Sequence, residues 1–330
     1  MPKAVALYSG GLDSSIAVCL VKDQGIDVEG FTMTTPFCCC GDAARIGAER
    51  LDIQLRVHEV DDSYYDILYN PRYGFGKGAN PCIDCRIYML ELAADMMREI
   101  GADFIFTGEV LGQRPMSQQI HHLEVVAKRS GLGDRLFRPL SAKFLPETYA
   151  ETSGLIDREK LPAIQGRTRR EIMELADHYG FGTAPSPSAG CTITERSFAP
   201  RVFDLIENND SAGGWEFSLL RVGRQVRINR KLKAAIGRNV EQNEQLAEFF
   251  EADNAPDCAL IEPEDFRGPT IIVVGPIDDE AIAAGGALCM RFGRPEPCDS
   301  DRPTCTVRHK DRQFTIHPEP SEEIEALKKL

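Results

Sequence analysis

Short apolar runs alternate with segments of helical periodicity along the first 110 residues. The apolar runs have the length of buried strands, and the intervening segments repeat their apolar positions every three to four residues. Strands that alternate with helices require right-handed crossovers, and these bury a parallel sheet on both faces. The pattern therefore predicts an α/β fold with strands at 4–8, 28–33, 55–60 and 104–107 and helices at 16–21, 43–51 and 88–100.

The pattern changes character after a Gly-rich stretch at 210–214. Beyond it we expect strand-like pieces at 218–222 and 225–228, one helix at 241–250 and another strand at 270–274. The chain thus divides into a first domain at 1–209, a linker at 210–214, and a smaller α+β domain at 215–330.

Charge is unevenly distributed along the 330 residues, which carry a net charge of −13. Residues 221–240 hold seven basic side chains and no acidic one, and residues 135–170 hold eight basic and four acidic ones. Two basic islands on an acidic body favour steering of a polyanion, although solvated helix faces would have the same composition. No apolar run reaches the ~18 residues of a membrane span, so we expect a cytoplasmic protein that does not bind membranes.

Residues 9–15, with the sequence SGGLDSS, follow the first predicted strand and precede the first predicted helix. Glycines let a backbone approach a phosphate closely, and a helix N-terminus directs free N–H groups at it. The Gly-Lys-Ser/Thr of the usual P-loop is absent. The stretch instead resembles the PP-loop of ATP pyrophosphatases, which cleave ATP to AMP and pyrophosphate while they adenylate a substrate oxygen.

This resemblance implies that the loop holds pyrophosphate and that Asp13 helps to place Mg²⁺. It also implies that the adenine lies at the end of the second strand. The expected nucleotide-binding residues are Ser9, Gly10, Gly11, Asp13, Ser14, Ser15, Met33 and Gly108.

Three of the eleven cysteines lie in sequence patterns typical of metal binding or nucleophilic attack. They are Cys82 and Cys85 at the start of a predicted helix, and Cys191 in a loop of small residues. A helix N-terminus favours the thiolate form of a nearby cysteine. Zinc normally takes four such ligands, whereas three thiolates suit a 4Fe–4S cluster with one open iron.

Five motifs together resemble the tRNA-thiolating PP-loop enzymes, the MnmA/ThiI-like group, over about residues 1–205. They are the PP-loop, 80–85, 107–117, 138–141 and 190–191. In the two-cysteine branch, a persulfide on one cysteine and a disulfide with the other release sulfur; the matching positions are Cys85 and Cys191. Because Cys82 replaces the aspartate of that branch, the chain is more similar to the iron–sulfur branch, which implies Cys82, Cys85 and Cys191 as cluster ligands.

The other cysteines give weaker signals. Cys38, Cys39 and Cys40 follow the second strand, and either a structural role or a role in sulfur relay or accessory ligation fits them. The cysteines at 258, 289, 298 and 305 lack metal-ligand spacing.

The segment at 217–290 resembles the RNA-binding domain of NFACT-type proteins, through the glycines and arginines of 221–243. Clustered arginines bind phosphates and position an RNA without reading its sequence. The candidate RNA contacts are Arg114, Arg224, Arg227 and Arg230.

These resemblances imply an ATP-dependent tRNA thiouridine synthase with Asp13, Cys85 and Cys191 as catalytic residues. Its cofactors would be ATP, Mg²⁺ and a 4Fe–4S cluster, and its partners tRNA and a sulfur donor, either sulfide or a persulfide carrier protein. A homodimer is compatible with this interpretation. The alternatives are a persulfide mechanism without a cluster and a PP-loop ligase that adenylates a small-molecule carboxylate.

Overall fold

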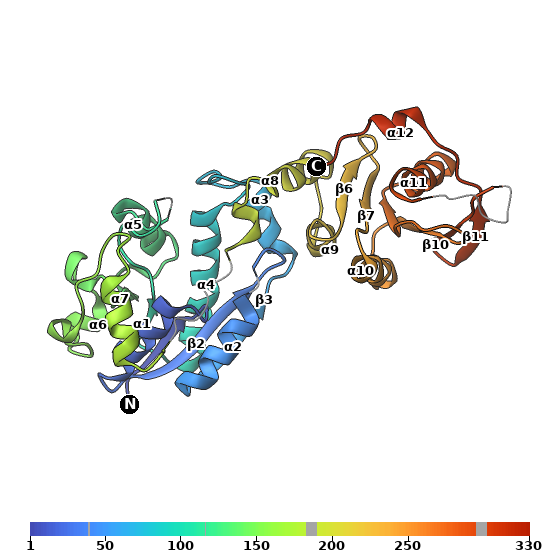
Figure 1. The fold of residues 1–330 in the computed structure, drawn as a ribbon. Helices are drawn as coiled ribbons and strands as arrows, with labels where there is room; N and C mark the ends of the chain where they lie inside the picture. Colours follow the sequence, from blue (N-terminus) through green and yellow to red (C-terminus); the bar gives the residue numbers. More distant parts are fainter. Residues whose placement is uncertain (39, 116, 183–189, 295–301) are drawn as a thin grey trace. The chain divides into compact units, whose positions relative to one another are not determined.

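The computed structural model describes residues 1–330 except 39, 116, 183–189 and 295–301. The chain forms two compact units, Met1–Glu195 and Arg196–Leu330 (Figure 1). The linker expected at 210–214 stays a prediction; those residues join two helices that both belong to the second unit.

The first unit is built on a five-stranded sheet of order β3-β2-β1-β4-β5, in which every pair is parallel. Its side chains are mostly apolar because helices cover both faces. The predicted parallel α/β fold is therefore confirmed. The strands are β1 (Lys3–Leu7), β2 (Asp27–Thr34), β3 (Gln54–Glu59), β4 (Phe104–Thr107) and β5 (Leu136–Phe137).

Helices α1, α2 and α7 gather on one side of this sheet, and α4 packs against β1, β4 and α5. The alternate residues Ala4, Ala6 and Tyr8 of the β1 region share a core with α1 and α7. The helices are α1 (Leu12–Lys22), α2 (Cys40–Leu51), α3 (Asp66–Tyr69), α4 (Cys82–Ile100), α5 (Ile120–Arg129), α6 (Tyr149–Thr152) and α7 (Arg170–His178), with short 3₁₀ turns η1 (Asp62–Tyr65), η2 (Gly133–Arg135), η3 (Ala142–Phe144), η4 (Arg158–Lys160) and η5 (Thr192–Thr194).

The strand order reverses beside β1, since β2 and β3 follow on one side and β4 and β5 on the other. Ligands of such sheets bind beyond the carboxyl ends of the strands at this switch point. The loop at 9–11 and the residues after β2 and β4 lie at that edge. The N-terminus of α4 lies there as well, because a crossover helix runs opposite to the parallel strands.

The second unit contains a six-stranded antiparallel sheet of order β11-β10-β8-β9-β7-β6. Helices α9 and α10 share a core with one face and α11 with the other. The elements are α8 (Ala199–Asn208), α9 (Gly214–Leu219), β6 (Arg224–Arg227), β7 (Lys233–Ile236), α10 (Val240–Glu251), β8 (Cys258–Pro263), β9 (Ile271–Val274), α11 (Asp279–Phe292), β10 (Cys305–His309), β11 (Arg312–Ile316) and α12 (Glu322–Ala326).

This unit also contains α11, β7, β8, β10 and β11, which were not predicted from the sequence, and one predicted element differs. The strand expected at 218–222 is wrong: the segment comprises the end of α9 and the turn that follows it. Trp215, Phe217 and Leu219 of α9 are all buried, so this short helix buries more than one of its faces. Apolar residues at alternate positions are the pattern expected of a strand, which explains the wrong prediction. No helix among the described residues is long and apolar enough to cross a bilayer.

Candidate functional site

The loop between β1 and α1 has the tight backbone that a phosphate cradle needs. Gly10 has a φ of +73°, and a Cβ at this position would overlap the backbone of Ala43 in α2. The hydroxyls of Ser14 and Ser15 both donate to the carbonyl oxygen of Gly11, at 2.8 and 3.1 Å. These bonds fix the turn around a helix start where only glycine fits at position 10.

The N-terminus of α1 has no side-chain cap, so its first N–H groups remain available to an anion. Gly108, directly after β4, packs against this turn: a Cβ there would stand 2.5 Å from the backbone nitrogen of Ser14. A side chain at position 108 would therefore displace the helix start. Among the predicted nucleotide-binding residues, the structure brings Gly108 and Ser14 into contact.

Asp13, on the first turn of α1, is held by two side chains from distant parts of the unit. Gln113 donates from Nε2 to Oδ2 at 3.0 Å, and Arg169 forms an ion pair with Oδ1 at 3.3 Å. The Asp13 side chain keeps 22% of its surface exposed. The sequence did not single out Arg169, whose only signal was its place in the basic island 135–170.

Met33 lies near the carboxyl end of β2, opposite His58 in β3, and is buried. Its contact with an adenine stays a prediction.

The predicted thiols converge on one place in the first unit. Cys82 begins α4, and its sulfur accepts a 3.0 Å hydrogen bond from the side-chain amide of Asn80. One turn later, the sulfur of Cys85 lies 3.6 Å from the hydroxyl of Tyr64. Asp84 between them accepts from the backbone N–H groups of residues 72 and 73, which ties the preceding loop to this helix start.

Backbone hydrogen bonds bring the loop with Cys191 to the same site. The nitrogen of Ala79 donates to the carbonyl of Ile193 at 3.0 Å, and the nitrogen of Thr192 donates to the carbonyl of Phe37 at 2.9 Å. The second bond joins the residue after Cys191 to the residue before Cys38. The structure therefore adds Cys38 to the three cysteines selected from the sequence.

The four thiols are close enough to interact electrostatically. Burial is the main cause that raises the pKa of Cys85 to about 11; the thiols of Cys82 and Cys38 act in the same direction, while Tyr64 and Arg86 oppose it. Burial likewise raises the pKa of Cys191 to about 12, with Cys85, Cys38 and Cys82 acting in the same direction. The expectation that the helix N-terminus acidifies Cys85 is wrong, because desolvation of the thiolate outweighs the helix dipole.

The donor set fits an iron–sulfur cluster in kind, since thiolates are the usual ligands of such clusters and three stand together here. The arrangement of these thiols does not form such a site, because the described residues contain no group of three His, Cys, Asp or Glu side chains that could hold a metal ion. Cys39 and Cys298 lie outside the described residues, and Cys258, Cys289 and Cys305 are buried.

A buried ion-pair network holds the start of α4, the helix that carries Cys82 and Cys85, in place. Glu109, only 4% exposed, lies 3.3 Å from Arg86 and 3.1 Å from Arg138. Burial alone would raise the pKa of Glu109, but the two arginines and a hydrogen bond from Thr107 hold it below its usual value. Because Arg86 follows Cys85, this network fixes the start of α4 relative to β4.

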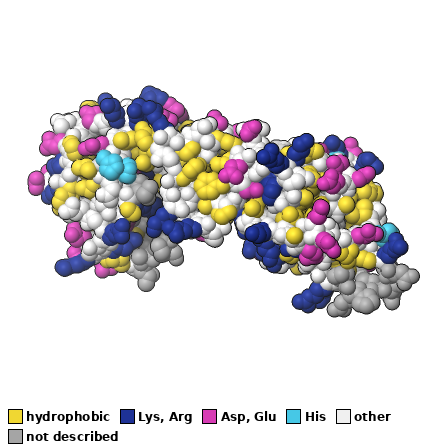
Figure 2. Space-filling view, turned by 90° about the horizontal axis from the view of Figure 1, so that it is seen from above, with side chains coloured by type: hydrophobic (Ala, Val, Ile, Leu, Met, Phe, Trp, Pro, Cys, Tyr) yellow, Lys and Arg dark blue, Asp and Glu magenta, His cyan; other side chains and the backbone are white. Residues whose placement is uncertain are grey.

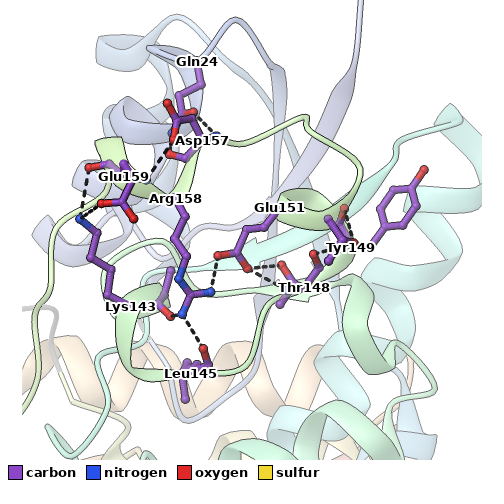
Figure 3. Close-up of polar contacts among 11 residues, drawn as sticks. Gln24, Lys143, Leu145, Thr148, Tyr149, Glu151, Asp157, Arg158 and Glu159 are labelled. Carbon is purple, nitrogen blue, oxygen red and sulfur yellow. Dashed lines mark hydrogen bonds and ion pairs between the residues drawn. The ribbon is translucent and has the colours of Figure 1, made fainter.

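Many cations of the basic island at 135–170 stabilise the fold. Arg158 pairs with Glu151 at 2.7 Å and donates to the carbonyl of Leu145 at 2.6 Å, as Figure 3 shows. Lys143 pairs with Glu159 at 3.4 Å in the same view. These pairs reduce the number of charges that could meet a polyanion.

The candidate RNA contacts have different environments. Arg114 and Arg230 are exposed. Arg224 lies over the ring of Phe292, and Arg227 pairs with Asp204 at 2.8 Å with 19% of its side chain exposed. On the face drawn in Figure 2, Lys and Arg side chains form separate groups among acidic and apolar ones.

Comparison with known proteins finds a matching family model for part of each unit. Residues 2–129 match the family model described as tRNA methyl transferase HUP domain, and residues 223–327 match the one described as NFACT protein RNA binding domain. The second match confirms the predicted resemblance to the NFACT-type RNA-binding domain, and the curated relatives described next confirm the one to PP-loop tRNA-thiolating enzymes.

Among curated relatives, the tRNA-specific 2-thiouridylase MnmA of Rhizobium etli is 28% identical over 236 residues, which cover 64% of this chain and 54% of that protein. MnmA of Pelobacter propionicus is 33% identical over 244 residues, 70% of this chain and 62% of that protein. The chain thus matches between half and two thirds of the length of these relatives.

A solved 4-thiouridine synthetase in complex with RNA and bound ATP is similar at 22% identity, with a TM-score of 0.40 over 64% of this chain and 54% of that one.

Proposed function

We propose that this protein is an ATP-dependent tRNA thiouridine synthase. The observation that carries the proposal is the placement of two sites at one edge of the parallel sheet: the loop at 9–15, and the thiols of Cys82, Cys85 and Cys191. The first suits ATP activation and the second suits sulfur transfer. The similarity to MnmA proteins over about two thirds of the chain supports the pairing of these activities.

In the proposed reaction, a uracil carbonyl oxygen attacks the α-phosphorus of ATP, and pyrophosphate leaves with the electrons of the broken P–O bond. The N-terminus of α1 and the hydroxyls of Ser14 and Ser15 would bind the leaving pyrophosphate. Asp13 would help to hold Mg²⁺ against these phosphates, with Gln113 and Arg169 fixing its carboxylate. Sulfur then adds to the activated carbon, and AMP departs with the former carbonyl oxygen.

The sulfur-transfer step has two versions. In the first, Cys82, Cys85 and Cys191 would hold a 4Fe–4S cluster, which would supply an open coordination site for sulfur. In the second, Cys85 and Cys191 act as a persulfide and resolving pair without a cluster. Cys82 favours the first version, since the persulfide mechanism leaves it idle. The raised pKa of the partly buried Cys85 and Cys191 thiols means that both are protonated at neutral pH while no metal binds them.

The second unit is proposed to bind the tRNA, with Arg114 on the first unit as a further contact. The match to an RNA-binding domain family supports this assignment. A sulfide ion or a persulfide carrier protein would supply the sulfur, and the enzyme would act in the cytoplasm.

The test is pyrophosphate release from ATP in the presence of unmodified tRNA, combined with mass spectrometry of the digested nucleosides. We expect tRNA to stimulate release and thiouridine to form when a sulfur source is added. A ligase that adenylates a carboxylate would instead respond to amino acids or other small acids. Release that tRNA does not stimulate, with no thiouridine formed, would overturn the proposal.

A further inference from the structure

A cavity of about 460 Å³ opens in the second unit, beside the edge of the sheet formed by β6 and β7. Gln225 and Arg227 on β6 point to the same face because they are two residues apart, and Lys233 on β7 lies opposite Arg227 in the register. All three line the cavity, together with Trp215 of α9 and, after β6, Arg230 and Lys231.

The charges beneath this cavity do not balance. Asp204 on α8 accepts from Arg227 at 2.8 and 3.0 Å and lies 3.4 Å from the ammonium of Lys233. One carboxylate thus serves two cations, and the side chain of Lys233 is only 8% exposed. Burial lowers the pKa of Lys233 to about 8, and the neighbouring Arg227 and Arg201 add to this effect while Asp204 opposes it.

Of the three buried cationic donors that lack hydrogen-bond acceptors among the described residues, two belong to this group of charges. They are Nζ of Lys233 and Nε of Arg201. Leaving a charged donor buried without an acceptor destabilises a fold, so such groups usually mark a missing partner. An acceptor that carries negative charge would satisfy the donor of Lys233 and balance the excess charge.

The carboxylates in the cavity wall do not supply that charge. Glu216 accepts from the backbone nitrogen of Gly213 at 3.0 Å and so closes the start of α9. Asp257 pairs with His309 at 2.9 Å and with Lys310 at 3.2 Å. At the mouth, Arg230 and Lys231 are both exposed.

We propose that this cavity binds a phosphate group of an RNA strand, with Lys233 as the buried ligand and Arg230 at the mouth. The proposal depends on the RNA-binding role given above to this unit and assigns it a defined site. Lys233 is suited to this task because it shares its one carboxylate, Asp204, with Arg227, and a phosphate would add the missing negative charge. Free phosphate has the same chemistry, so the test must separate the two sources.

The experiment measures binding of a fluorescent single-stranded oligoribonucleotide to the full chain over a series of salt concentrations, with inorganic phosphate titrated separately. The variants are Lys233→Met, which keeps the length of the side chain, and Arg230→Ala, an exposed change that leaves the fold intact. Arg312→Ala is the matched control, since Arg312 is exposed on β11 at the opposite edge of the same sheet.

We expect Lys233→Met and Arg230→Ala each to raise the Kd for RNA about tenfold and to reduce the slope of log K against log salt by about 1, as for loss of one phosphate contact. Arg312→Ala should change neither quantity. Unchanged RNA binding in both variants would overturn the proposal. Loss of inorganic phosphate binding alone would overturn the RNA assignment in favour of a small-anion site.

This result is independent of the thiolation chemistry. Pyrophosphate release at saturating tRNA should be the same in the control Arg312→Ala as in the unmodified chain. If the unmodified chain releases no pyrophosphate with tRNA while the Kd values change as expected, the proposed enzyme activity fails and the phosphate site stands.

Discussion

Arg169 and Asp13 lie 156 residues apart in the chain and form an ion pair with 3.3 Å between their charged groups. The pair joins the residue before α7 to the first turn of α1, and Gln113 binds the second carboxylate oxygen at 3.0 Å. The carboxylate is therefore oriented before any nucleotide arrives. A carboxylate fixed in this way can bind a cation without first losing side-chain freedom.

Replacement of Asp13 should separate chemistry from RNA binding. We expect Asp13→Ala to lower the rate of pyrophosphate release at least 100-fold, because the charge that places Mg²⁺ is lost, while the Kd for tRNA changes less than threefold. Asp23→Ala, an exposed change at the other end of the same helix, should leave the rate intact. A large loss of tRNA affinity in Asp13→Ala would mean that the loop organises the RNA site as well.

The thiols give a second prediction, which separates the two versions of sulfur transfer. Protein purified without oxygen should contain iron and acid-labile sulfide, and Cys82→Ala should lose both along with thiolation, since a ligand is removed. The control is Cys19→Ala, because Cys19 lies in α1 and packs against the core.

A protein that thiolates tRNA yet contains no iron would contradict the cluster and leave the persulfide pair. In that case Cys82→Ala should keep its activity, and Cys85→Ala and Cys191→Ala should each abolish it.

Glu109 gives a prediction about stability. Glu109→Gln leaves Arg86 and Arg138 without their buried countercharge and should lower the free energy of unfolding by about 3–5 kcal/mol. Because the folded pKa of Glu109 lies below its value of 4.5 in an unfolded chain, its contribution is present above pH 4.5 and is lost as the pH falls further.

Thermal melting at pH 7 and at pH 3.5 would measure this effect. The difference in Tm between the unmodified chain and Glu109→Gln should be large at pH 7 and smaller at pH 3.5. A difference that does not depend on pH would show that the charge of Glu109 is not what stabilises the fold.

The sequence predicted the parts of the site that follow from local chemistry. The order of glycines and serines in residues 9–15 is sufficient to predict a phosphate-binding loop. The spacing of Cys82 and Cys85 places both on the first turns of one helix. The alternation of apolar runs was sufficient for the parallel sheet. These features depend on short-range pattern, which a single sequence displays.

Long-range neighbours could not be found in this way. Arg169 pairs with Asp13, and the loop with Cys191 is bonded to the segment before Cys38, only because distant segments meet at one sheet edge. The pKa of Cys85 is a property of burial, which overrides the local helix dipole. Arg227 and Lys233 were both part of the basic island at 221–240, but only the fold shows that they share Asp204 instead of facing solvent.

The last prediction concerns Lys233, through which both the stability of the protein and its affinity for RNA should depend on pH. Its pKa of about 8 lies below the usual 10.5, owing first to burial and then to Arg227 and Arg201, against Asp204. Between pH 8 and 10.5 the unfolded chain therefore binds more protons at this position, so stability should rise with pH. The gain from pH 7 to pH 9.5 should be about 2 kcal/mol relative to Lys233→Met. Affinity for RNA should fall over the same range, because the ammonium that binds the phosphate is lost.

Urea unfolding and RNA titration at several pH values would measure both effects. Lys328→Met, an exposed change in the same unit, should follow the unmodified chain in both measurements. RNA affinity that falls through pH 8 equally in Lys233→Met would trace the pH dependence to another group. An affinity that falls only when Lys233 is present would identify its ammonium as the phosphate ligand, because no other change distinguishes the two proteins.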